Sequence, residues 1–484
     1  MTNSNHACNH NLKRLESGYR EVEQRLHDYN EVENMLSVDE VKEQASRCLS
    51  CGTPFCHGYA CPLGNIIPEI NEFIAMGHWK EALTLLLSTH PFPEFTARIC
   101  PALCEGSCVL SINDKAVTIR QAEKLIIEMG FNKGWVKPRT PLKRRAERIA
   151  VIGSGPAGLS VAELLNRKGF SVTVFEKDLN PGGLLMYGIP NFKLEKSIVQ
   201  RRIQLMQEEG IIFECGIAAG VDVSFNYLKR HFEAIVLSGG SEKPRDIEVE
   251  GRNLKEIHFA MDLLKSQNKR LIGEPLNAAE DIDARGKRVV VIGGGDTGSD
   301  CIGVALRQGA KKVTQVEILP RLPHERKADN PWPLWPNVDR SSSSHRENEN
   351  RNGIRLWCID TKRFTGNSAG KVRQLHCCEI CWVNRDGRMV PVQKEDSDFT
   401  LDADLVLLAL GYVGPGPNPL IDTLNLSRDE KGYILLNDQH MTSFPGVFSC
   451  GDIARGQSLV VRAMADGIAA AEHIASYLFG AKHL

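Results

Sequence analysis

The sequence predicts an α/β protein in which a helical, cysteine-rich N-terminal domain precedes two Rossmann-like dinucleotide-binding domains, one inserted in the other. Three observations support this prediction. Two apolar runs, at 148–152 and 288–292, each end in a Gly-x-Gly-x-x-Gly turn followed by a helical pattern. Seven of the fifteen cysteines crowd between Cys48 and Cys108. A later apolar run, 405–410, indicates a buried parallel strand that returns the chain to the first of the two nucleotide domains.

Length and charge limit the class of protein. The 484 residues suffice for about three domains. We expect a helical domain at 1–145, a first nucleotide domain at 146–283 and again at 405–484, and a second nucleotide domain at 284–404. With 25% charged residues and a net charge of −1, the chain gives no reason to expect nucleic acid or an anionic membrane as a partner.

The ends and apolar runs of the chain indicate its compartment. The N-terminus lacks the basic and apolar regions of a signal peptide, and Cys8 has no catalytic context around it. No apolar run approaches the roughly 18 residues of a membrane span. We therefore expect a cytoplasmic protein, with no membrane partner. An odd number of cysteines, in a reducing compartment, also argues against a disulfide framework.

The cysteines of the helical domain form two groups. The first has the spacing Cys-x2-Cys-x4-Cys-x4-Cys-Pro and the second Cys-Pro-x2-Cys-x3-Cys. Short thiolate spacings with Cys-Pro pairs are typical of iron–sulfur clusters. A zinc site would need closed sets of four ligands, and seven thiolates do not divide that way. The seven candidates are Cys48, Cys51, Cys56, Cys61, Cys100, Cys104 and Cys108.

Seven thiolates are one short of two [4Fe-4S] clusters. Glu123, on a helical stretch just past Cys108, is a possible eighth ligand, and the alternative is an ordinary surface glutamate. Spacing alone leaves both open. Ser37 is predicted to cap the helix before the first group, and 66–74 and 79–86 are predicted amphipathic helices that bring the second group back to the first.

The first glycine motif predicts a nucleotide held on a strand-turn-helix. Gly153 would make the tight turn, Gly155 would let the backbone approach a pyrophosphate, and Gly158 would let the helix pack on the strand. Pro156 and Ala157 open that helix, whose N-terminus would face the phosphates. Three further residues were expected to complete the site: Glu176 accepting a hydrogen bond from a ribose, and Gly183 and Leu184 on a loop closing over the nucleotide.

The second motif repeats the first. Its glycines and the residues between them are Gly293, Gly295, Asp296, Thr297 and Gly298, and Glu317 ends the next strand. Two dinucleotide folds in one chain suggest hydride transfer from a nicotinamide to a flavin, which needs no acid or base from the protein.

The coenzyme is left open between NADH and NADPH. Glu317 favours the free 2′-hydroxyl of NADH, whereas the nearby Arg321, Arg326 and Lys327 could accept the 2′-phosphate of NADPH. The loop 331–336, rich in Pro and Trp, is either an exposed linker or a part of cofactor closure.

Two later features complete the pattern. Gly451 and Asp452 precede a helix rich in small residues, so Asp452 is expected to accept a hydrogen bond from the ribityl chain of a flavin; a capping aspartate is the alternative. Cys378 and Cys381, with Cys377 beside them, lie in a strand-like run with no second ligand pair and are expected to be buried structural thiols.

Taken together, the cysteine pattern, both glycine motifs, the stretch 182–194 and the turn 447–452 resemble the small (beta) subunits of bacterial glutamate synthases. The resemblance runs nearly end to end and includes 28–31 and 92–95. It implies an NAD(P)H-oxidising flavoprotein with FAD, two [4Fe-4S] clusters and a large (alpha) subunit that makes glutamate from glutamine and 2-oxoglutarate. The resemblance, together with the basic residues after the strand, favours NADPH as the coenzyme, against the indication from Glu317.

The resemblance also implies a division of the cluster ligands. It would place Cys48, Cys51, Cys56 and Cys108 on one cluster, and Cys61, Cys100 and Cys104 with Glu123 on the other. Two alternatives use the same module: a dihydropyrimidine dehydrogenase-like or a ferredoxin-NADP transhydrogenase-like electron-input subunit. A scaffold with a dead nicotinamide site is a third, which the intact glycines of the second motif disfavour.

Overall fold

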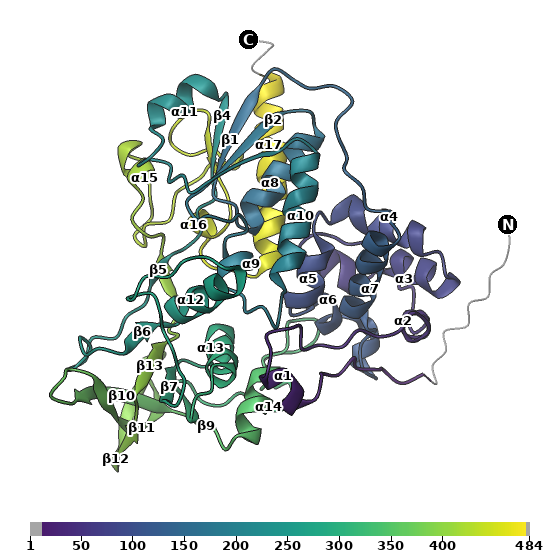
Figure 1. Ribbon diagram of the computed structural model, residues 1–484. Helices are drawn as coiled ribbons and strands as arrows, with labels where there is room; N and C mark the ends of the chain where they lie inside the picture. The colour runs from purple at the N-terminus through teal and green to yellow at the C-terminus, as the bar shows by residue number, and fades with distance from the viewer. Residues whose placement is uncertain (1–11, 481–484) are drawn as a thin grey trace.

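The structure, a computed structural model, describes residues 12–480 (Figure 1). Cys8 and the residues around it, on which the expectation of a missing signal peptide depends, lie outside this range. The described chain forms a helical domain followed by two five-stranded parallel sheets with helices packed on them. The predicted α/β fold class is therefore confirmed.

The helical domain packs its helices around an apolar core contributed by α2, α3, α4 and α7. Ser37 caps α2 as predicted: its side chain accepts from the backbone N–H of Glu40, and the Glu40 carboxylate accepts from the backbone N–H of Ser37 at 2.8 Å. The elements are α1 (Val22–Leu26), α2 (Val38–Ala45), η1 (Cys56–Ala60), α3 (Ile67–Met76), α4 (Trp79–Thr89), α5 (Pro93–Ile99), α6 (Leu103–Gly106), η2 (Val109–Ile112) and α7 (Ile119–Asn132).

The first nucleotide domain is a parallel sheet of strand order β15-β4-β1-β2-β3. Helices α8 and α17 lie side by side against it (Figure 1). Its elements are β1 (Arg148–Ile152), α8 (Pro156–Arg167), β2 (Ser171–Glu176), α9 (Leu184–Tyr187), α10 (Lys196–Glu208), β3 (Ile212–Cys215), α11 (Phe225–His231), β4 (Ala234–Leu237), α15 (Pro419–Thr423), β15 (Val447–Ser449), α16 (Asp452–Arg455) and α17 (Val460–Gly480).

The second nucleotide domain has the parallel strand order β6-β13-β7-β8-β9, again with the strand of the glycine motif in the middle. A three-stranded antiparallel sheet, β10-β11-β12, extends from it. The elements are β6 (Ile257–Phe259), α12 (Ala260–Ile272), β7 (Arg288–Ile292), α13 (Asp296–Arg307), β8 (Lys312–Glu317), α14 (Ser343–Asn350), β9 (Ile354–Trp357), β10 (Ile359–Gly366), β11 (Val372–Arg385), β12 (Arg388–Asp402) and β13 (Leu405–Leu408).

The expected boundaries at 283/284 and 404/405 are wrong. Strand β6 and helix α12 precede residue 284, and β13 follows residue 404, yet both strands pair within the second sheet. The chain crosses between the domains at β5 (Lys243–Pro244) and β14 (Tyr412–Gly414), which pair antiparallel. A short strand that is buried on both faces has the same apolar sequence whichever of the two sheets it belongs to. Its domain is therefore known only from the strands with which it pairs.

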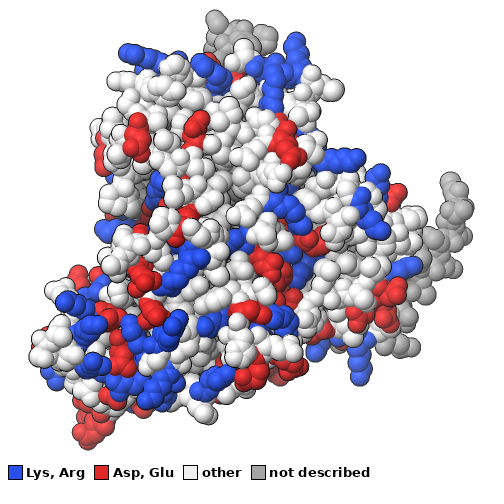
Figure 2. Space-filling view, in the orientation of Figure 1, with Lys and Arg blue, Asp and Glu red and all other residues white. Residues whose placement is uncertain are grey.

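The charged surface agrees with a balanced net charge. Figure 2 shows Lys and Arg interspersed with Asp and Glu over the visible face, including the region of β10, β11 and β12. Within residues 12–480, no helix is both long and apolar enough to cross a bilayer.

Candidate functional site

A cavity of about 820 Å³ lies where the two nucleotide domains meet. Its wall includes the first glycine turn, the end of β2, α9 and the 452–463 segment from the first domain, and α12, Thr297 and the end of β13 from the second. The predicted site residues that line it are Gly153, Gly155, Pro156, Ala157, Glu176, Gly183, Leu184, Thr297 and Asp452. One nucleotide site thus opens directly onto the other domain.

Neighbouring backbone leaves no room for a side chain at two of the three glycines of the first motif. Gly153 has φ +102°, and a Cβ there would lie 2.7 Å from the carbonyl oxygen of Ser238. A Cβ on Gly158 would lie 2.1 Å from the Gly153 carbonyl oxygen, so helix and turn touch. A Cβ on Gly155 would meet nothing within 4 Å, and this glycine faces the cavity. The turn leaves the open space that a pyrophosphate would fill.

Glu176 is buried beside this turn. The backbone N–H of Ser154 donates to its Oε2 at 3.0 Å, and the backbone N–H of Asp178 donates to its Oε1 at 3.0 Å. The Ser154 hydroxyl also donates to Oε2. Ser154 was not predicted as a site residue, although its place between Gly153 and Gly155 was a visible signal.

Asp452 begins helix α16 and lines the same cavity. Burial raises the pKa of its carboxyl to about 6, although the Ser458 hydroxyl donates to Oδ1 at 3.2 Å. Gly451, behind it, has φ +73° and a would-be Cβ 2.7 Å from the Cβ of Ala157. The Gly-Asp turn therefore packs against the first glycine helix, and its carboxylate faces the cavity.

The second motif reproduces the first. Gly293 has φ +120°, and its would-be Cβ lies 2.3 Å from the Ala409 carbonyl oxygen. A Cβ on Gly298 would lie 2.5 Å from the Gly293 carbonyl oxygen, whereas a Cβ on Gly295 would meet nothing. Asp296 and Thr297 open α13. Both motifs therefore leave the same space above the second glycine, at a helix N-terminus.

Glu317 lies over the second turn. A Cβ on Gly294 would lie 2.4 Å from its Oε2, while its Oε1 accepts from the backbone N–H of Leu319 at 2.8 Å. Gly294 stands where the first motif has Ser154, so Glu317 lacks the hydroxyl donor that holds Glu176. Its Oε2 is the oxygen that faces the turn.

The basic residues after β8 differ in what they contact. Arg321 donates to Asp339 at 2.7 Å, and its guanidinium lies 4.8 Å from the ring centre of Trp357. Arg355 lies 4.9 Å from the same ring and 3.9 Å from Asp339. Two guanidinium groups therefore share the Asp339 carboxylate, and the Glu349 carboxylate also acts on Arg355. Arg326 instead donates to three backbone carbonyls, one of them in the helical domain.

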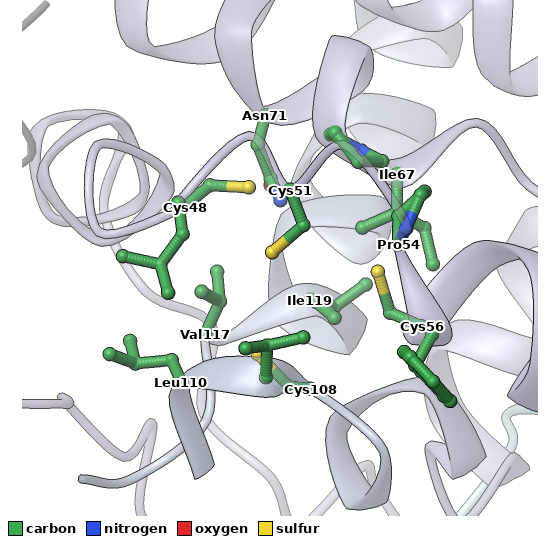
Figure 3. Close-up of a pocket in the computed structure, with 14 residues that line it drawn as sticks. Cys48, Cys51, Pro54, Cys56, Ile67, Asn71, Cys108, Leu110, Val117 and Ile119 are labelled. Atoms are coloured by element: carbon green, nitrogen blue, oxygen red, sulfur yellow. The ribbon is translucent and has the colours of Figure 1, made fainter. Parts of the chain in front are cut away.

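Four thiols of the helical domain surround one hollow. The hollow is lined by Cys48 and Cys51 from the loop after α2, by Cys56 at the start of η1 and by Cys108 just before η2 (Figure 3). Burial, together with the other three thiols, raises the pKa of the Cys56 thiol to about 12. Asn71 is drawn beside Cys48 and Cys51 and lines the same hollow.

The other three cysteines gather around Glu123. Burial, with a contribution from the Glu123 carboxylate, raises the pKa of Cys100 to about 11 and that of Cys104 well above its usual value. The same two causes raise the pKa of Cys61. Glu123 is 8% exposed and accepts from Asn65 Nδ2 at 2.8 Å. The interpretation of Glu123 as a surface glutamate is therefore wrong. Burial raises the pKa of its carboxyl to about 7.

These two groups fit polynuclear centres by their chemistry. Within residues 12–480, no three His, Cys, Asp or Glu side chains are arranged to hold a single metal ion. The thiols are half-buried or buried, and within each group the neighbouring thiols or carboxylate oppose the ionisation of each thiol. A bound cationic centre would reverse that opposition, because metal binding requires deprotonated thiols.

The nucleotide cavity reaches the second thiol group. Ile99, the last residue of α5, lines the cavity, and Cys100 follows it directly. Cys100 belongs to the group around Glu123. No sequence signal showed this proximity, because it depends on how α5 docks on the first nucleotide domain.

The loop 331–336 is not an exposed linker. It packs on the helical domain, where the Trp332 ring centre lies 4.7 Å from that of Phe55 and the Ser107 hydroxyl donates to the carbonyl of Pro333 at 2.7 Å. The prediction of buried thiols at 377–381 is confirmed for Cys377 and Cys378 but wrong for Cys381, which is exposed on β11.

Comparisons with known proteins define the class. Residues 25–135 match the model of dihydropyrimidine dehydrogenase domain II with a 4Fe-4S cluster. Residues 147–333 and 362–467 match the model of pyridine nucleotide-disulphide oxidoreductases. FprA of Mycobacterium tuberculosis in complex with NADPH is 19% identical, with a TM-score of 0.54 over 70% of this chain and 86% of that one, and so shares the fold. The class is an iron–sulfur pyridine-nucleotide oxidoreductase.

Curated relatives define the family within this class. The glutamate synthase [NADPH] small chain of M. tuberculosis is 46% identical over 96% of this chain and 94% of its own length. The glutamate synthase [NADH] of Schizosaccharomyces pombe is 44% identical over 96% of this chain, which spans 22% of that protein. The chain belongs to the glutamate synthase small-chain family. It is an NAD(P)H-dependent oxidoreductase that uses FAD, a nicotinamide coenzyme and iron–sulfur clusters.

Proposed function

We propose that this chain is the electron-input subunit of a glutamate synthase. It would oxidise NAD(P)H, pass the electrons through FAD and two [4Fe-4S] clusters, and deliver them to a large subunit that makes glutamate from glutamine and 2-oxoglutarate. One observation carries the proposal: a single cavity is lined by Gly155 of the first motif, Thr297 of the second, and Ile99 beside Cys100.

The protein's work in this reaction is to hold and orient its cofactors. When bound, the nicotinamide supplies a hydride, and the flavin and clusters carry its electrons onward. Gly155 and Gly295 would let the two pyrophosphates approach the helices α8 and α13, and Asp452 would accept a hydrogen bond from the flavin's ribityl chain. Leu184 and Tyr187 supply apolar wall that excludes water from the cavity.

We propose the ligand sets that the two thiol groups support. Cys48, Cys51, Cys56 and Cys108 would hold one cluster, and Cys61, Cys100 and Cys104 with Glu123 the other, in line with the neighbours that each thiol meets. Cys51→Ala and Cys104→Ala should each lose mainly one cluster, and a different one. Electron paramagnetic resonance of the anaerobically purified, reduced variants tests this division. Loss of the same cluster in both would contradict it.

For the coenzyme we propose NADPH. The guanidinium groups of Arg321 and Arg355, both beside the Trp357 ring, are donors of the kind that suits a 2′-phosphate. Glu317 argues for NADH, because its Oε2 faces the turn where a ribose hydroxyl would lie. A kcat/KM for NADH about tenfold above that for NADPH, equivalent to about 1.4 kcal/mol, would show that Glu317 dominates.

The proposed partner is a glutamate synthase large subunit, and the proposed compartment is the cytoplasm, where thiol ligands stay reduced. Alone, the purified chain should oxidise NADPH with ferricyanide and form no glutamate. Mixed with a large subunit, it should support glutamine-dependent synthesis. Glutamate made from glutamine by this chain in isolation would overturn the proposal. Failure to couple to any such subunit would favour a different electron acceptor.

A further inference from the structure

In the described part of the chain, one arginine of the segment between β8 and α14 makes no direct polar contact. In the part of the chain that the structure describes, Arg340 makes neither a hydrogen bond nor an ion pair. Its guanidinium instead lies 3.9 Å from the ring centre of Trp335. Burial and the neighbouring Arg326 lower the pKa of Arg340, and the Asp296 carboxylate raises it. Arg321 and Arg355, by contrast, both face Asp339.

The segment that carries Arg340 runs along the first turn of α13. The Ser342 hydroxyl, two residues further on, lies 2.6 Å from that of Ser299, which is three residues after Asp296 at the start of α13. Helices α13 and α14 lie side by side (Figure 1). This anchor places Arg340 near the N-terminus of α13, where Gly295 leaves open space.

We propose that Arg340 binds the diphosphate of the nicotinamide coenzyme, with its guanidinium held in place by Trp335. The proposal rests on the proposed function, because it assumes that a dinucleotide occupies the second motif. An arginine without a partner is suited to a phosphate, with which it forms charge-assisted, often bidentate hydrogen bonds. Stacking on an indole ring holds the guanidinium in one orientation before the ligand arrives.

Trp335 connects this arginine to the helical domain. A Cβ on Gly106, which lies between Cys104 and Cys108, would come within 2.9 Å of the Trp335 ring. The Trp335 carbonyl accepts from Asn330 Nδ2 at 3.0 Å, which fixes its backbone. Trp335 is thus a positioning residue, and the cluster-bearing domain sets where its ring lies.

The first test measures binding rather than turnover. In isothermal titration of the flavin-loaded, cluster-loaded chain, Arg340→Gln should raise the Kd for NADP⁺ and for NAD⁺ by the same factor, about tenfold. Arg340→Lys should recover part of the loss. Arg385→Gln, which removes the same charge from the exposed end of the β11–β12 hairpin, should stay within about twofold of the wild type.

The outcomes separate this proposal from the function on which it rests. Wild-type protein that binds neither dinucleotide would overturn both. If the wild type binds and Arg340→Gln binds equally well, only the role of Arg340 is overturned. Weakening of NADP⁺ binding alone would overturn the assignment to the diphosphate, because the contact would then be with the 2′-phosphate.

A second test acts from the other domain. Gly106→Ala must displace the Trp335 ring, so it should raise both dissociation constants although it lies outside the nucleotide domain. Gly58→Ala is the matched control, because a Cβ there meets nothing within 4 Å. Iron content and the visible spectrum should match the wild type in the control. Unchanged dinucleotide binding in Gly106→Ala would overturn the positioning role of Trp335.

Discussion

Glu123 is a buried carboxyl group that accepts a hydrogen bond from the Asn65 side chain. An uncompensated carboxylate in such a place is costly, and the raised pKa of about 7 expresses that cost. The three thiols around it are also raised in pKa. A cluster shared by these four groups would remove the conflict.

Glu123→Gln should therefore lose mainly the cluster assigned to Cys61, Cys100 and Cys104 and retain the other. The amide keeps the size of the side chain but supplies no anionic oxygen to iron. Iron analysis and electron paramagnetic resonance of the reduced protein measure the loss. Glu72→Gln, an exposed change in the same domain, should keep both clusters. Retention of both clusters in Glu123→Gln would contradict its role as a ligand.

For single residues, the sequence predicted the kind of chemistry better than it predicted which side chains are buried or lie together. The spacing of the seven cysteines indicated iron–sulfur clusters, but it left Glu123 open, because the burial of a glutamate depends on how α7 packs. Arg340 was missed for the same reason, because an arginine five residues after a tryptophan has no evident role until its neighbours in space are known. Ser154 was missed although its place between two glycines of the motif was visible in the sequence.

At the scale of elements, two glycines of the first motif can be tested separately. Gly158 lets helix α8 touch the turn at Gly153, whereas Gly155 leaves space for the cofactor. Gly158→Ala would drive a Cβ to 2.1 Å from the Gly153 carbonyl oxygen, so it should destabilise the domain and lose FAD. Gly155→Ala should fold, because its Cβ meets nothing in the protein, yet it should bind FAD at least about tenfold more weakly. Thermal unfolding of the flavin-free proteins, with FAD titration, measures both effects. Equal destabilisation by the two changes would contradict this account.

A second prediction concerns the pairing of β7 with β13. The Arg288 guanidinium holds the pKa of the Asp404 carboxyl well below its usual range, and Arg373 also donates to it. A depressed carboxyl pKa stabilises the fold above the unfolded value of about 3.9 and loses that contribution as pH falls through the folded value.

Asp404→Asn should thus lower the free energy of unfolding by about 1–2 kcal/mol at pH 7, and the difference should vanish in acid. Unfolding followed as a function of pH tests this. Asp402→Asn, which removes a more exposed partner of Arg288, should have the smaller effect. A difference that grows as the pH falls would contradict the sign.

Elements were predicted well where local pattern decides them. The helices α3 and α4, the Ser37 cap and the strands of both glycine motifs lie where periodicity and capping placed them. The domain limits failed because β6 and β13 are short apolar strands whose pairing is set by distant partners. Cys381 differs from Cys377 because β11 extends beyond the domain into solvent.

For the whole molecule, short stretches of the helical domain join it to the nucleotide domains. Phe92 and Phe95 are fully buried in the core of the first nucleotide domain. Between them, Glu94 pairs with Arg202 of α10, and both side chains are at most 4% exposed. The stretch 92–95, one of those on which the resemblance depends, therefore serves to pack the helical domain onto the first nucleotide domain and does not line the site.

Glu94→Gln should lower the stability of the whole protein by about 3 kcal/mol, because it removes the carboxylate that pairs directly with the buried Arg202 guanidinium and leaves it with the longer-range charges of Glu163 and Glu209. Denaturant unfolding of the loaded protein measures the loss. Glu81→Gln, an exposed change on α4, should be neutral. A neutral Glu94→Gln would show that water reaches Arg202 once the pair is broken.

The insertion of one domain in the other has a consequence for synthesis. Strand β15, at 447–449, pairs with β4, at 234–237, while everything from β6 to β13 belongs to the inserted domain. A ribosome therefore finishes the nicotinamide domain before the edge strand of the flavin sheet exists. The inserted domain can fold as soon as it leaves the ribosome. The flavin sheet must wait for β15, and until then one edge of β4 is unpaired and can pair with a non-native strand. During translation, the domain that receives the coenzyme is complete before the one that receives the flavin.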